Sequence, residues 1–380
     1  MRIVLFIVEL TVGGTQRQVA VLASAMAQRG CDVCVVALFP GGKFWTMLRD
    51  DPAVSTCSLF SKKRKGLWSA LRSRCLGIMR LRRKLRAMDS PVIYSFLNDG
   101  NVLAWFATRG TASSRLAWAV RSGNSSLSAK SEVFFRISRI LSPGMPLVIS
   151  NSSAGRSHCE DKGWRPKCFS VVPNGIDTDR FVPDADQRRR VRRDLGIDDD
   201  TLLVGLVGRV SPVKNHENFL RAAACVLQVK KSVRFVCVGG GPAKLMSRLV
   251  ALQNELGLRD SLAWHEDQDT RKYYCAFDIT CMVSTGEGFP NVVAESMSCA
   301  TPCIVTDVGD AAEIVADTGV IAMGTEPAQI AAAILELAEL SEADRQAMGE
   351  KARLSIRARY SIDRLVTATA AELTRLSCDQ

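Results

Sequence analysis

The sequence predicts an α/β protein built from two doubly wound, parallel-sheet domains of similar size. Short apolar runs typical of buried strands alternate with longer amphipathic segments typical of helices, and this alternation occurs twice. The 380 residues are too many for one ordinary domain. A charged stretch at 174–200 separates the two series. We therefore expect a first domain over 1–180 and a second over 181–360.

The first series opens with a strand, a glycine turn and a helix. The apolar start runs into Gly13 and Gly14, and a helix is expected over 15–30. Thr15 and Gln18 have the spacing of a capping box at its start. The expected strands of this series cover 2–10, 31–38, 91–97, 115–120 and 146–150. Parallel strands buried on both faces have continuous apolar runs of this kind.

The second series repeats the same order of elements. Its expected strands cover 201–208, 233–239, 278–284 and 302–307. Its expected helices cover 215–229, 243–257 and 290–300. The last stretch of the chain, about 361–380, contains a further amphipathic helix.

Composition favours a cytoplasmic protein. No run approaches the roughly 18 apolar residues of a membrane span. The opening MRIVLFIVEL is a poor signal peptide, because its apolar run is short and Glu9 interrupts it. The 13 cysteines are odd in number and scattered, as expected for reduced thiols. Cys31 and Cys34 form a C-x-x-C inside an expected strand, which favours core residues over a redox or metal site.

Charge is distributed unevenly along the chain. Residues 1–180 hold 27 Lys and Arg against 11 Asp and Glu, whereas 181–380 hold 23 against 28. The segment Lys62–Arg86 has eleven basic residues, no acid, and apolar residues near helical spacing. This pattern is typical of a helix on an anionic membrane surface. A solvated basic face over an ordinary core stripe explains it equally well, and nucleic-acid binding is disfavoured.

Two cations follow the first strand of the second series. Ligands of open parallel sheets bind beyond the carboxyl ends of the strands. Arg209 and Lys214 lie there, directly before an expected helix N-terminus, which attracts anions. The pair predicts a diphosphate site. His216 follows Lys214 and is either a phosphate contact or a helix N-terminal residue.

Glycine turns follow two other expected strands. Gly239 and Gly240 follow one in the second series, and Gly13 and Gly14 follow the first strand of the chain. Glycine allows close approach of backbone to a ligand, although tight turns also require it.

The stretch EGFPNVVAESMSCATPC, residues 287–303, carries two carboxylates eight positions apart. Pro290 suits the first turn of a helix. Glu287 then lies in the preceding loop and Glu295 on the second turn, where each carboxylate suits a pair of hydroxyls. A glycosidase pair stands about 5 to 9.5 Å apart. Eight residues at helical rise span about 12 Å, which favours hydroxyl binding.

No metal ion is expected. His158, His216 and His265 do not have metal-ligand spacing. The D-x-D strings at 177–179 and 267–269 are ordinary loop sequences. Cations already lie at the expected phosphate position.

Together these motifs resemble family 4 of the retaining glycosyltransferases. The matching pieces are GGTQRQ at 13–18, VPNGID at 172–177, GRVSPVKN at 208–215, VGGGP at 238–242 and the stretch 287–315. The resemblance implies the GT-B fold, in which two Rossmann-like domains face each other across a cleft. It also implies that the final helix crosses back to pack on the first domain.

The resemblance implies roles for individual residues. Arg209, Lys214 and Glu287 would be catalytic, the two cations neutralising the donor diphosphate and Glu287 holding the donor sugar. Glu295 would bind ribose hydroxyls, and Gly13 and Gly14 would lie near the phosphates. Further donor contacts would come from Gly239, Gly240 and the backbone of Gly288, Phe289, Pro290, Asn291 and Val292. The donor would be a UDP- or GDP-linked sugar, with no cofactor and no metal.

One departure from the family pattern concerns the first domain. Many relatives carry a histidine near the donor sugar, after a middle strand. Here RLAWAVRSGN stands at that place, so Arg121 and Asn124 become the expected sugar or acceptor contacts.

We thus expect a hexosyltransferase acting on a lipid-linked or envelope saccharide, peripheral at the inner face of the membrane. An epimerase on the same fold is an alternative, but histidines are few. A non-enzymatic basic membrane-binding protein is another, but the intact set of Arg209, Lys214, Glu287 and Glu295 argues against it.

Overall fold

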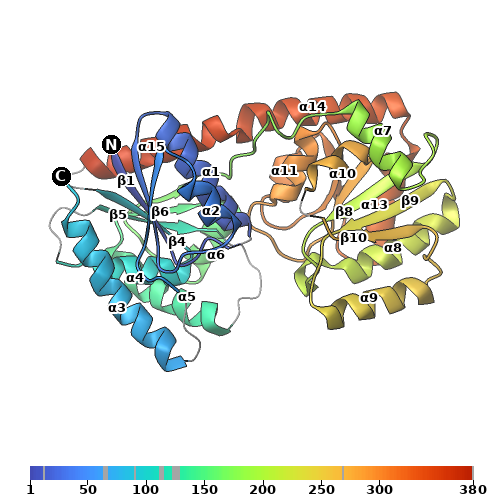
Figure 1. Ribbon diagram of the computed structural model, residues 1–380. Coiled ribbons are helices and arrows are strands. Elements are labelled where there is room, and N and C mark those ends of the chain that lie inside the picture. Colours follow the sequence, from blue (N-terminus) through green and yellow to red (C-terminus); the bar gives the residue numbers. More distant parts are fainter. Residues whose placement is uncertain are drawn as a thin grey trace. The chain divides into compact units, whose positions relative to one another are not determined.

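The chain divides into two compact units. Unit 1 comprises Met1–Gly175 with Ile362–Gln380, and unit 2 comprises Ile176–Ser361. The computed structural model describes residues 1–11, 13–62, 67–89, 91–110, 115–121, 129–267 and 269–378 (Figure 1). It describes only the backbone for 67–71, 129–130 and 377–378.

Unit 1 is a seven-stranded parallel sheet covered by helices on both faces (Figure 1). The strand order is β3-β2-β1-β4-β5-β6-β7. The strands are β1 (Arg2–Ile7), β2 (Asp32–Ala37), β3 (Val54–Ser58), β4 (Val92–Phe96), β5 (Arg115–Val120), β6 (Leu147–Ser150) and β7 (Phe169–Val171). The helices are α1 (Gly14–Gln28), α2 (Lys43–Arg49), α3 (Leu67–Arg86), α4 (Asn98–Thr108), α5 (Ala129–Leu141), α6 (Ser153–Asp161) and α15 (Ile362–Cys378).

Strand β1 shows why the sheet of unit 1 needs two covering layers. Successive side chains of a strand point to opposite faces. Ile3, Leu5 and Ile7 pack in the core beneath α1, α2 and α15. Val4 and Phe6 pack in the core beneath α3, α4 and α5. From Ile3 onward β1 is apolar at every position, and it is buried on both sides.

Unit 2 is a six-stranded parallel sheet in the order β10-β9-β8-β11-β12-β13. The strands are β8 (Leu202–Val207), β9 (Val233–Val238), β10 (Leu262–His265), β11 (Ile279–Met282), β12 (Cys303–Thr306) and β13 (Gly319–Ala322). The helices are α7 (Ala185–Asp194), α8 (His216–Val229), α9 (Ala243–Glu255), α10 (Arg271–Ala276), α11 (Asn291–Ser298), α12 (Ala311–Val315), α13 (Pro327–Glu339) and α14 (Glu342–Tyr360).

Strand β8 divides its side chains between two layers in the same way. Leu203 and Val207 pack in the core with residues of α10, α11 and α14. Leu202, Val204 and Leu206 pack in the core with residues of α8 and α13. The central strand of unit 2 is therefore also buried on both faces.

A buried charge network fastens α7 to this sheet. Arg192 is 3% exposed and donates to Asp278 Oδ2 at 3.0 Å and to the Thr201 carbonyl at 2.6 Å. Asp278 directly precedes β11 and also accepts the Leu203 N–H at 2.7 Å. Each buried charge therefore has a partner, as the cost of burying a charge requires.

The predicted fold class is confirmed: both units are parallel, doubly wound sheets. Every strand expected from the sequence is present, with ends shifted by up to three residues. The expected strands do not include β3, β7, β10 and β13, which are the four edge strands. Their residues are largely half-exposed, so they lack the continuous apolar runs of central strands.

The expected capping box at the start of α1 is wrong. The helix begins at Gly14, one residue earlier than expected, and its N-cap is Gly13. Gln18 is 2% exposed. Its side chain donates to the Gly175 carbonyl at 2.9 Å and accepts the Gly175 N–H at 3.1 Å. Gln18 therefore joins the motifs GGTQRQ and VPNGID, which are far apart in sequence.

Helix α15 packs within unit 1. It contacts α1 through Arg29, which donates to Thr367 Oγ1 at 2.8 Å and pairs with Asp363. Glu372 accepts a hydrogen bond from the Ser170 hydroxyl at 3.0 Å.

The twelve cysteines with described side chains are all free thiols. Within the described ranges, every helix is too short or too polar to cross a bilayer.

Candidate active site

The sheet of unit 2 reverses its winding between β8 and β11. From β8 the chain moves outward to β9 and β10, and from β11 it moves the other way to β12 and β13. Ligands of such sheets bind at this switch point, beyond the carboxyl ends of the strands. The loop after β8 carries Arg209 and Lys214, and the loop after β11 carries Glu287.

Lys214 and Glu287 meet at this switch point. Lys214 Nζ lies 2.6 Å from Glu287 Oε1, and the two side chains are 23% and 14% exposed. The Ser284 hydroxyl donates to the same oxygen at 2.7 Å. The Ser284 backbone carbonyl in turn accepts a hydrogen bond from the Thr306 hydroxyl at 2.6 Å. Ser284 and Thr306 are positioning residues that the sequence analysis missed, since single hydroxyls in strand-exit loops have no distinctive pattern.

The loop after β8 is held in a defined shape. A short 3₁₀ turn covers Pro212–Lys214, and Asn215 is left-handed with φ of 55°. The Asn215 and Asn218 side-chain amides both donate to the Thr325 carbonyl, at 3.2 and 2.8 Å. Arg209 is exposed and forms no ion pair with any acid in the described ranges. Its guanidinium is therefore available to a ligand at the switch point.

His216 begins α8 beside Lys214 but is a packing residue. It is 3% exposed and stacks on Trp264, with ring centroids 5.9 Å apart. Neither ring nitrogen has a hydrogen-bond partner among the described residues. Burial, with a smaller contribution from the Lys214 charge, lowers the pKa of His216 to about 4. The imidazole is thus neutral at physiological pH.

The glycine turn after β9 has a structural explanation. A Cβ on Gly239 would lie 2.1 Å from the Gly208 carbonyl oxygen, and one on Gly241 would lie 2.6 Å from that of Val210. A Cβ on Gly240 would collide with Glu266. These glycines let the turns after β8 and β9 pack against each other, which places Gly239 and Gly240 beside the loop of Arg209.

The loop before α11 is packed as well as polar. Phe289 is 6% exposed and meets the Tyr360 ring edge-on at 5.3 Å, so its side chain belongs to the core. The Gly288 carbonyl accepts the Asp310 N–H at 3.0 Å. Pro290 is the N-cap, and α11 begins at Asn291. The first turn of a helix presents N–H groups without intrahelical acceptors, here at Asn291 and Val292.

Glu295 has surroundings different from those of Glu287. It is 2% exposed, and the Tyr274 hydroxyl from α10 donates to its Oε2 at 3.3 Å. The motif thus places one carboxylate against the cation of the β8 loop and the other against a buried phenol. Tyr274 is a further residue that sequence spacing did not reveal, because α10 is only six residues long.

Unit 1 presents its expected residues at the carboxyl edge of its own sheet. Arg121 directly follows β5 and donates to Asn174 Oδ1 at 2.8 Å and to the Tyr94 hydroxyl at 3.2 Å. Gly13 is the N-cap of α1, and Gly14 is its first residue. The other predicted contact, Asn124, lies outside the described residues. Arg121 is therefore held in place by two buried groups.

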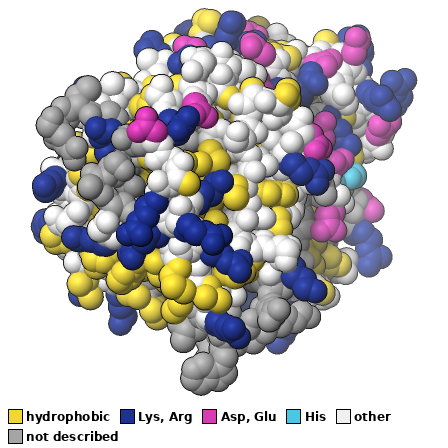
Figure 2. Space-filling view, turned by 60° about the vertical axis from the view of Figure 1, so that its left-hand side comes forward, with side chains coloured by type: hydrophobic (Ala, Val, Ile, Leu, Met, Phe, Trp, Pro, Cys, Tyr) yellow, Lys and Arg dark blue, Asp and Glu magenta, His cyan; other side chains and the backbone are white. Residues whose placement is uncertain are grey.

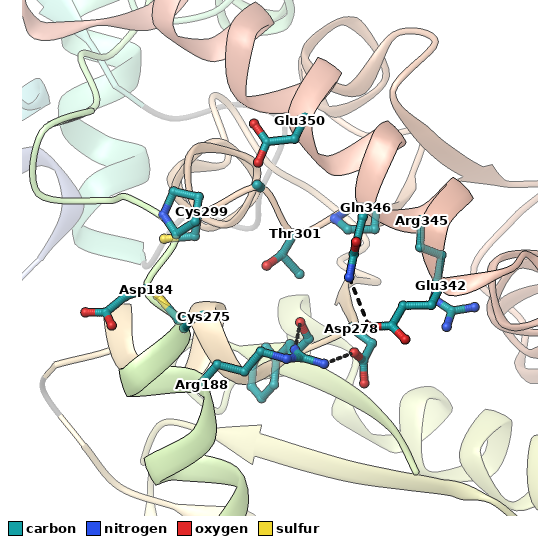
Figure 3. A pocket seen from close by; sticks show the side chains of 15 residues that line it. Asp184, Arg188, Cys275, Asp278, Cys299, Thr301, Glu342, Arg345, Gln346 and Glu350 are labelled. Atoms are coloured by element: carbon teal, nitrogen blue, oxygen red, sulfur yellow. Dashed lines mark hydrogen bonds and ion pairs between the residues drawn. The ribbon is translucent and has the colours of Figure 1, made fainter. Parts of the chain in front are cut away.

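A cavity of about 220 Å³ in unit 2 lies at the opposite edge of the sheet (Figure 3). Asp278 and Pro302 line it and directly precede β11 and β12. Figure 3 shows Arg188 reaching from α7 to pair with Asp278, and Cys275 and Cys299 lie at the same cavity. The cavity is at the amino ends of the strands, so it is not the switch-point site.

Comparison with known proteins agrees with this geometry. The family model described as Glycosyltransferase Family 4 matches residues 12–180, and the model described as Glycosyl transferases group 1 matches residues 201–339. The chain belongs to glycosyltransferase family 4. Both models cover the loops that carry the candidate residues, including Gly13, Arg209 and Glu287.

Curated relatives of this family 4 chain include proteins named D-inositol 3-phosphate glycosyltransferase. That of Geodermatophilus obscurus is 32% identical over 200 residues, covering 50% of this chain and 44% of the relative. That of Mycobacterium tuberculosis is 30% identical over 238 residues, covering 60% and 48%. The chain thus spans about half the length of the curated relatives it matches.

Solved structures share the GT-B fold of this family 4 chain. The Anabaena protein HepE in complex with UDP and glucose has a TM-score of 0.83 at 21% identity, covering 98% of this chain and 99% of that one. Sucrose-phosphate synthase from Thermosynechococcus elongatus has a TM-score of 0.83 at 19% identity, covering 100% of both chains.

Proposed function

We propose that this chain transfers a hexose-type sugar from a nucleotide sugar to a lipid-linked or envelope saccharide, with retention of anomeric configuration. The observation that carries the proposal is the contact between Lys214 and Glu287 at the switch point of unit 2. Its neighbour Arg209 adds a second cation on the same loop. Two cations and a carboxylate beside helix N-termini suit a sugar diphosphate.

The proposed chemistry is electrostatic. Cleavage of the bond between the sugar C1 and the diphosphate oxygen leaves positive charge on the ring and negative charge on the leaving group. Arg209 and Lys214 stabilise the leaving diphosphate as this charge develops. The acceptor oxygen bonds to C1 on the face that the diphosphate leaves, and the acceptor proton passes to the departing phosphate oxygen.

Lys214 can bind the diphosphate and keep its ion pair with Glu287 at the same time. An ammonium group has three donors, so Lys214 can hold Glu287 and a phosphate oxygen together. Glu287 keeps further lone pairs for sugar hydroxyls. Glu295, which accepts a hydrogen bond from the Tyr274 hydroxyl, is the proposed ribose contact. Since the side chains at the phosphate position are cations, we propose a metal-independent reaction with no cofactor.

A UDP-linked donor is favoured over a GDP-linked one. The Anabaena protein HepE, similar to this chain in fold, is described in complexes with UDP and with UDP-glucose. In unit 2, Gly239, Gly240 and the 288–292 backbone are further proposed donor contacts. In unit 1, Gly13 and Gly14 are proposed phosphate contacts. Arg121 is the proposed contact to sugar or acceptor.

The acceptor is proposed to reside at a membrane. Helix α3 sends Leu81 and Leu85 into the core but leaves Met79 57% exposed. Two of its arginines serve the fold: Arg80 donates to the Leu59 carbonyl at 2.5 Å, and Arg82 donates to carbonyls at the end of α4. Besides Arg80, the exposed cations of α3 are Arg72, Arg83 and Arg86.

Neighbouring helices extend this exposed apolar surface. Phe106 of α4 is 42% exposed, and Val133 and Ile140 of α5 are 56% and 70% exposed. On the face drawn in Figure 2, Lys and Arg side chains lie among hydrophobic ones, with few acids around them. Such a mixture suits anionic lipid, with apolar groups inserting at the headgroup level.

The test is a donor-by-acceptor assay with the full chain. UDP- and GDP-sugars are supplied with bacterial membrane extract, a lipid-linked oligosaccharide, or an inositol phosphate, the last suggested by the relatives' names. Transfer to any acceptor, with the α or β configuration of the donor retained, supports the proposal. Conversion of the donor sugar without an acceptor would instead identify an epimerase. If neither reaction occurs and no nucleotide stabilises the protein against thermal unfolding, the proposal that the chain is an enzyme is refuted.

A further inference from the structure

Unit 1 contains a cavity of about 520 Å³ that the proposed reaction does not use. Arg115 and Leu147 line it, and they are the first residues of β5 and β6. All strands of this sheet are parallel, so they begin at one edge and end at the other. Arg121 follows the opposite end of β5. The cavity therefore lies at the far edge of the sheet from the expected acceptor and donor contacts of unit 1.

The cavity is strongly cationic. Among the described residues that line it, one is acidic, Glu372, and four are basic: Arg109, Arg115, Lys167 and Arg375. Glu372 is already engaged, because it pairs with Arg375 at 3.1 Å and accepts the Ser170 hydroxyl at 3.0 Å. In the described ranges, Arg109, Arg115 and Lys167 form no ion pair. Like charges held together in this way favour a bound anion.

One of these cations is held in position, and another has a buried donor without a partner among the described residues. The Arg109 guanidinium lies over the Trp105 ring, 4.2 Å from its centroid. Gly144 leaves room for it, since a Cβ there would stand 3.2 Å from Arg109 Nη2. Arg115 Nε is buried and has no hydrogen-bond partner among the described residues. A buried N–H without an acceptor costs free energy. A ligand oxygen that accepts from it would remove this cost and so contribute to the binding free energy.

The size and walls of the cavity indicate what the anion is attached to. A volume of 520 Å³ falls within the roughly 300–1,000 Å³ typical of small-molecule sites, and it exceeds what a lone phosphate fills. Trp105, Met145, Pro146 and Leu376 supply apolar wall. Guanidinium groups bind phosphate oxygens in a bidentate manner.

We propose that this cavity is a second anion site, which binds a phosphate ester through Arg109, Arg115 and Lys167 while its carbon skeleton rests on the Trp105 wall. The phosphate ester belongs either to a soluble metabolite or to a lipid headgroup. Phe106, the residue after Trp105, is 42% exposed and stands edge-on to it at 5.0 Å, so a headgroup could reach the site from a membrane surface.

The experiment compares charge-matched variants of the full chain. Arg109→Gln with Arg115→Gln removes two cavity cations, and Arg83→Gln with Arg86→Gln removes two exposed cations of α3. Binding of glycerol 3-phosphate is measured by calorimetry, with inorganic phosphate and glycerol as comparisons. Every titration is repeated in the Lys214→Ala background, so that binding at the cavity is separated from phosphate binding at the proposed active site.

We expect the cavity variant to bind glycerol 3-phosphate at least about tenfold more weakly, because charge-assisted hydrogen bonds are lost. The α3 variant should bind it as the unaltered chain does, and the loss caused by the cavity substitutions should persist in the Lys214→Ala background. Vesicles of phosphatidylglycerol and of phosphatidylcholine form the second arm. A cavity-dependent loss seen only with phosphatidylglycerol vesicles would place the phosphate on a lipid.

Equal binding by the cavity and α3 variants in both arms would overturn the proposal, as would absence of binding to the unaltered chain. Should the double variant fail to fold, Lys167→Gln serves in its place, since Lys167 is exposed. We expect it to weaken binding by about threefold or more. Neither result depends on sugar transfer, so the site stands or falls independently of the proposed enzyme activity.

Discussion

The contact between Lys214 and Glu287 could not be read from the motifs that contain the two residues. Both residues are recognisable in the sequence, but 73 positions separate them. The structure joins them at 2.6 Å and adds Ser284 to the same carboxylate oxygen. Because the carboxylate holds the ammonium group, Lys214 is oriented before a substrate arrives. Preorganised charge of this kind is a major source of enzymatic rate enhancement.

We predict that Lys214→Ala lowers the turnover number about 100- to 1000-fold, the typical loss for one preorganised donor to a developing anion. The fold should persist, since Lys214 is partly exposed. Steady-state kinetics with the donor found in the proposed donor-by-acceptor assay measures the effect. Lys231→Ala is the matched control, because Lys231 is exposed and precedes β9 at the other edge of the sheet. A turnover number equal to that of the control would contradict the assigned role.

The lowered pKa of His216 predicts that the stability of the folded protein depends on pH. Its pKa is lowered to about 4 in the folded protein, chiefly by burial, whereas an unfolded histidine titrates near about 6.5. Between these values the unfolded chain binds a proton that the folded chain does not. Stability is therefore complete above about pH 6.5 and falls as pH is lowered toward 4, by about 3 kcal/mol from this group.

His216→Phe should remove that dependence. Phenylalanine retains the stacking on Trp264, and no described hydrogen bond is lost, because neither ring nitrogen has a described partner. We expect similar unfolding free energies for both proteins at about pH 7.5, and a smaller decline for the variant toward pH 4.5. Urea unfolding across this range measures it. Parallel curves for the two proteins would show that His216 does not titrate as described.

Helix α11 and the loop before it act as one element. The loop is held from the next turn along the sheet, where Gly309 has φ of +62°. A Cβ on Gly309 would lie 2.4 Å from the Gly288 carbonyl oxygen and 2.8 Å from that of Glu287. Position 309 therefore controls where Glu287 stands, although it lies 22 residues beyond it in the sequence.

We predict that Gly309→Ala displaces this loop and lowers turnover about 100-fold, a loss typical of misplaced catalytic groups. Gly257→Ala is the matched control: Gly257 has φ of +68° but nothing within 4 Å of its Cβ position. Both variants should lose about 1 kcal/mol of stability from backbone strain. Thermal unfolding and kinetics on both proteins separate strain from displacement. Comparable activities in the two variants would mean that the contact with Glu287 is unimportant.

The whole molecule is electrostatically divided. The first 180 residues carry most of the positive charge, with 27 basic against 11 acidic residues. The structure shows that some of these arginines bond to carbonyls of their own unit, such as Arg80 and Arg82. The remaining exposed cations of α3 lie beside exposed apolar residues. The number of basic residues alone therefore overstates how many cations are available to bind an anionic membrane.

We predict that replacing Lys62, Lys63, Arg64 and Lys65 with serine weakens sedimentation with anionic vesicles at least about tenfold at low salt. Of these four, Lys62 alone lies within the described ranges. The effect should shrink as salt rises, because screening acts on exposed charge. The matched control replaces four exposed cations of unit 2 with serine: Arg189, Arg190, Arg193 and Lys231. Equal sedimentation of the two variants would remove the membrane proposal.

The fold could be predicted in large part, because central strands are apolar at nearly every position and helices are periodic. The missed strands have one cause: β3, β7, β10 and β13 are edge strands, whose half-exposed residues do not form an apolar run. The residue types of the candidate site were also recognisable, since Arg209, Lys214 and Glu287 follow strands. Their supporting residues, such as Ser284 and Tyr274, were not.

By itself the sequence determined the alternation of strands and helices, and hence two parallel sheets whose strand-exit loops carry cations and carboxylates. Only the tertiary structure decided which of those groups touch: Lys214 with Glu287, and Gln18 with Gly175 rather than with its own helix. It also brought Arg109, Arg115 and Lys167 around one cavity. The physical reason is that periodicity records burial over a few neighbouring residues, whereas a contact between distant residues depends on the path of the whole chain.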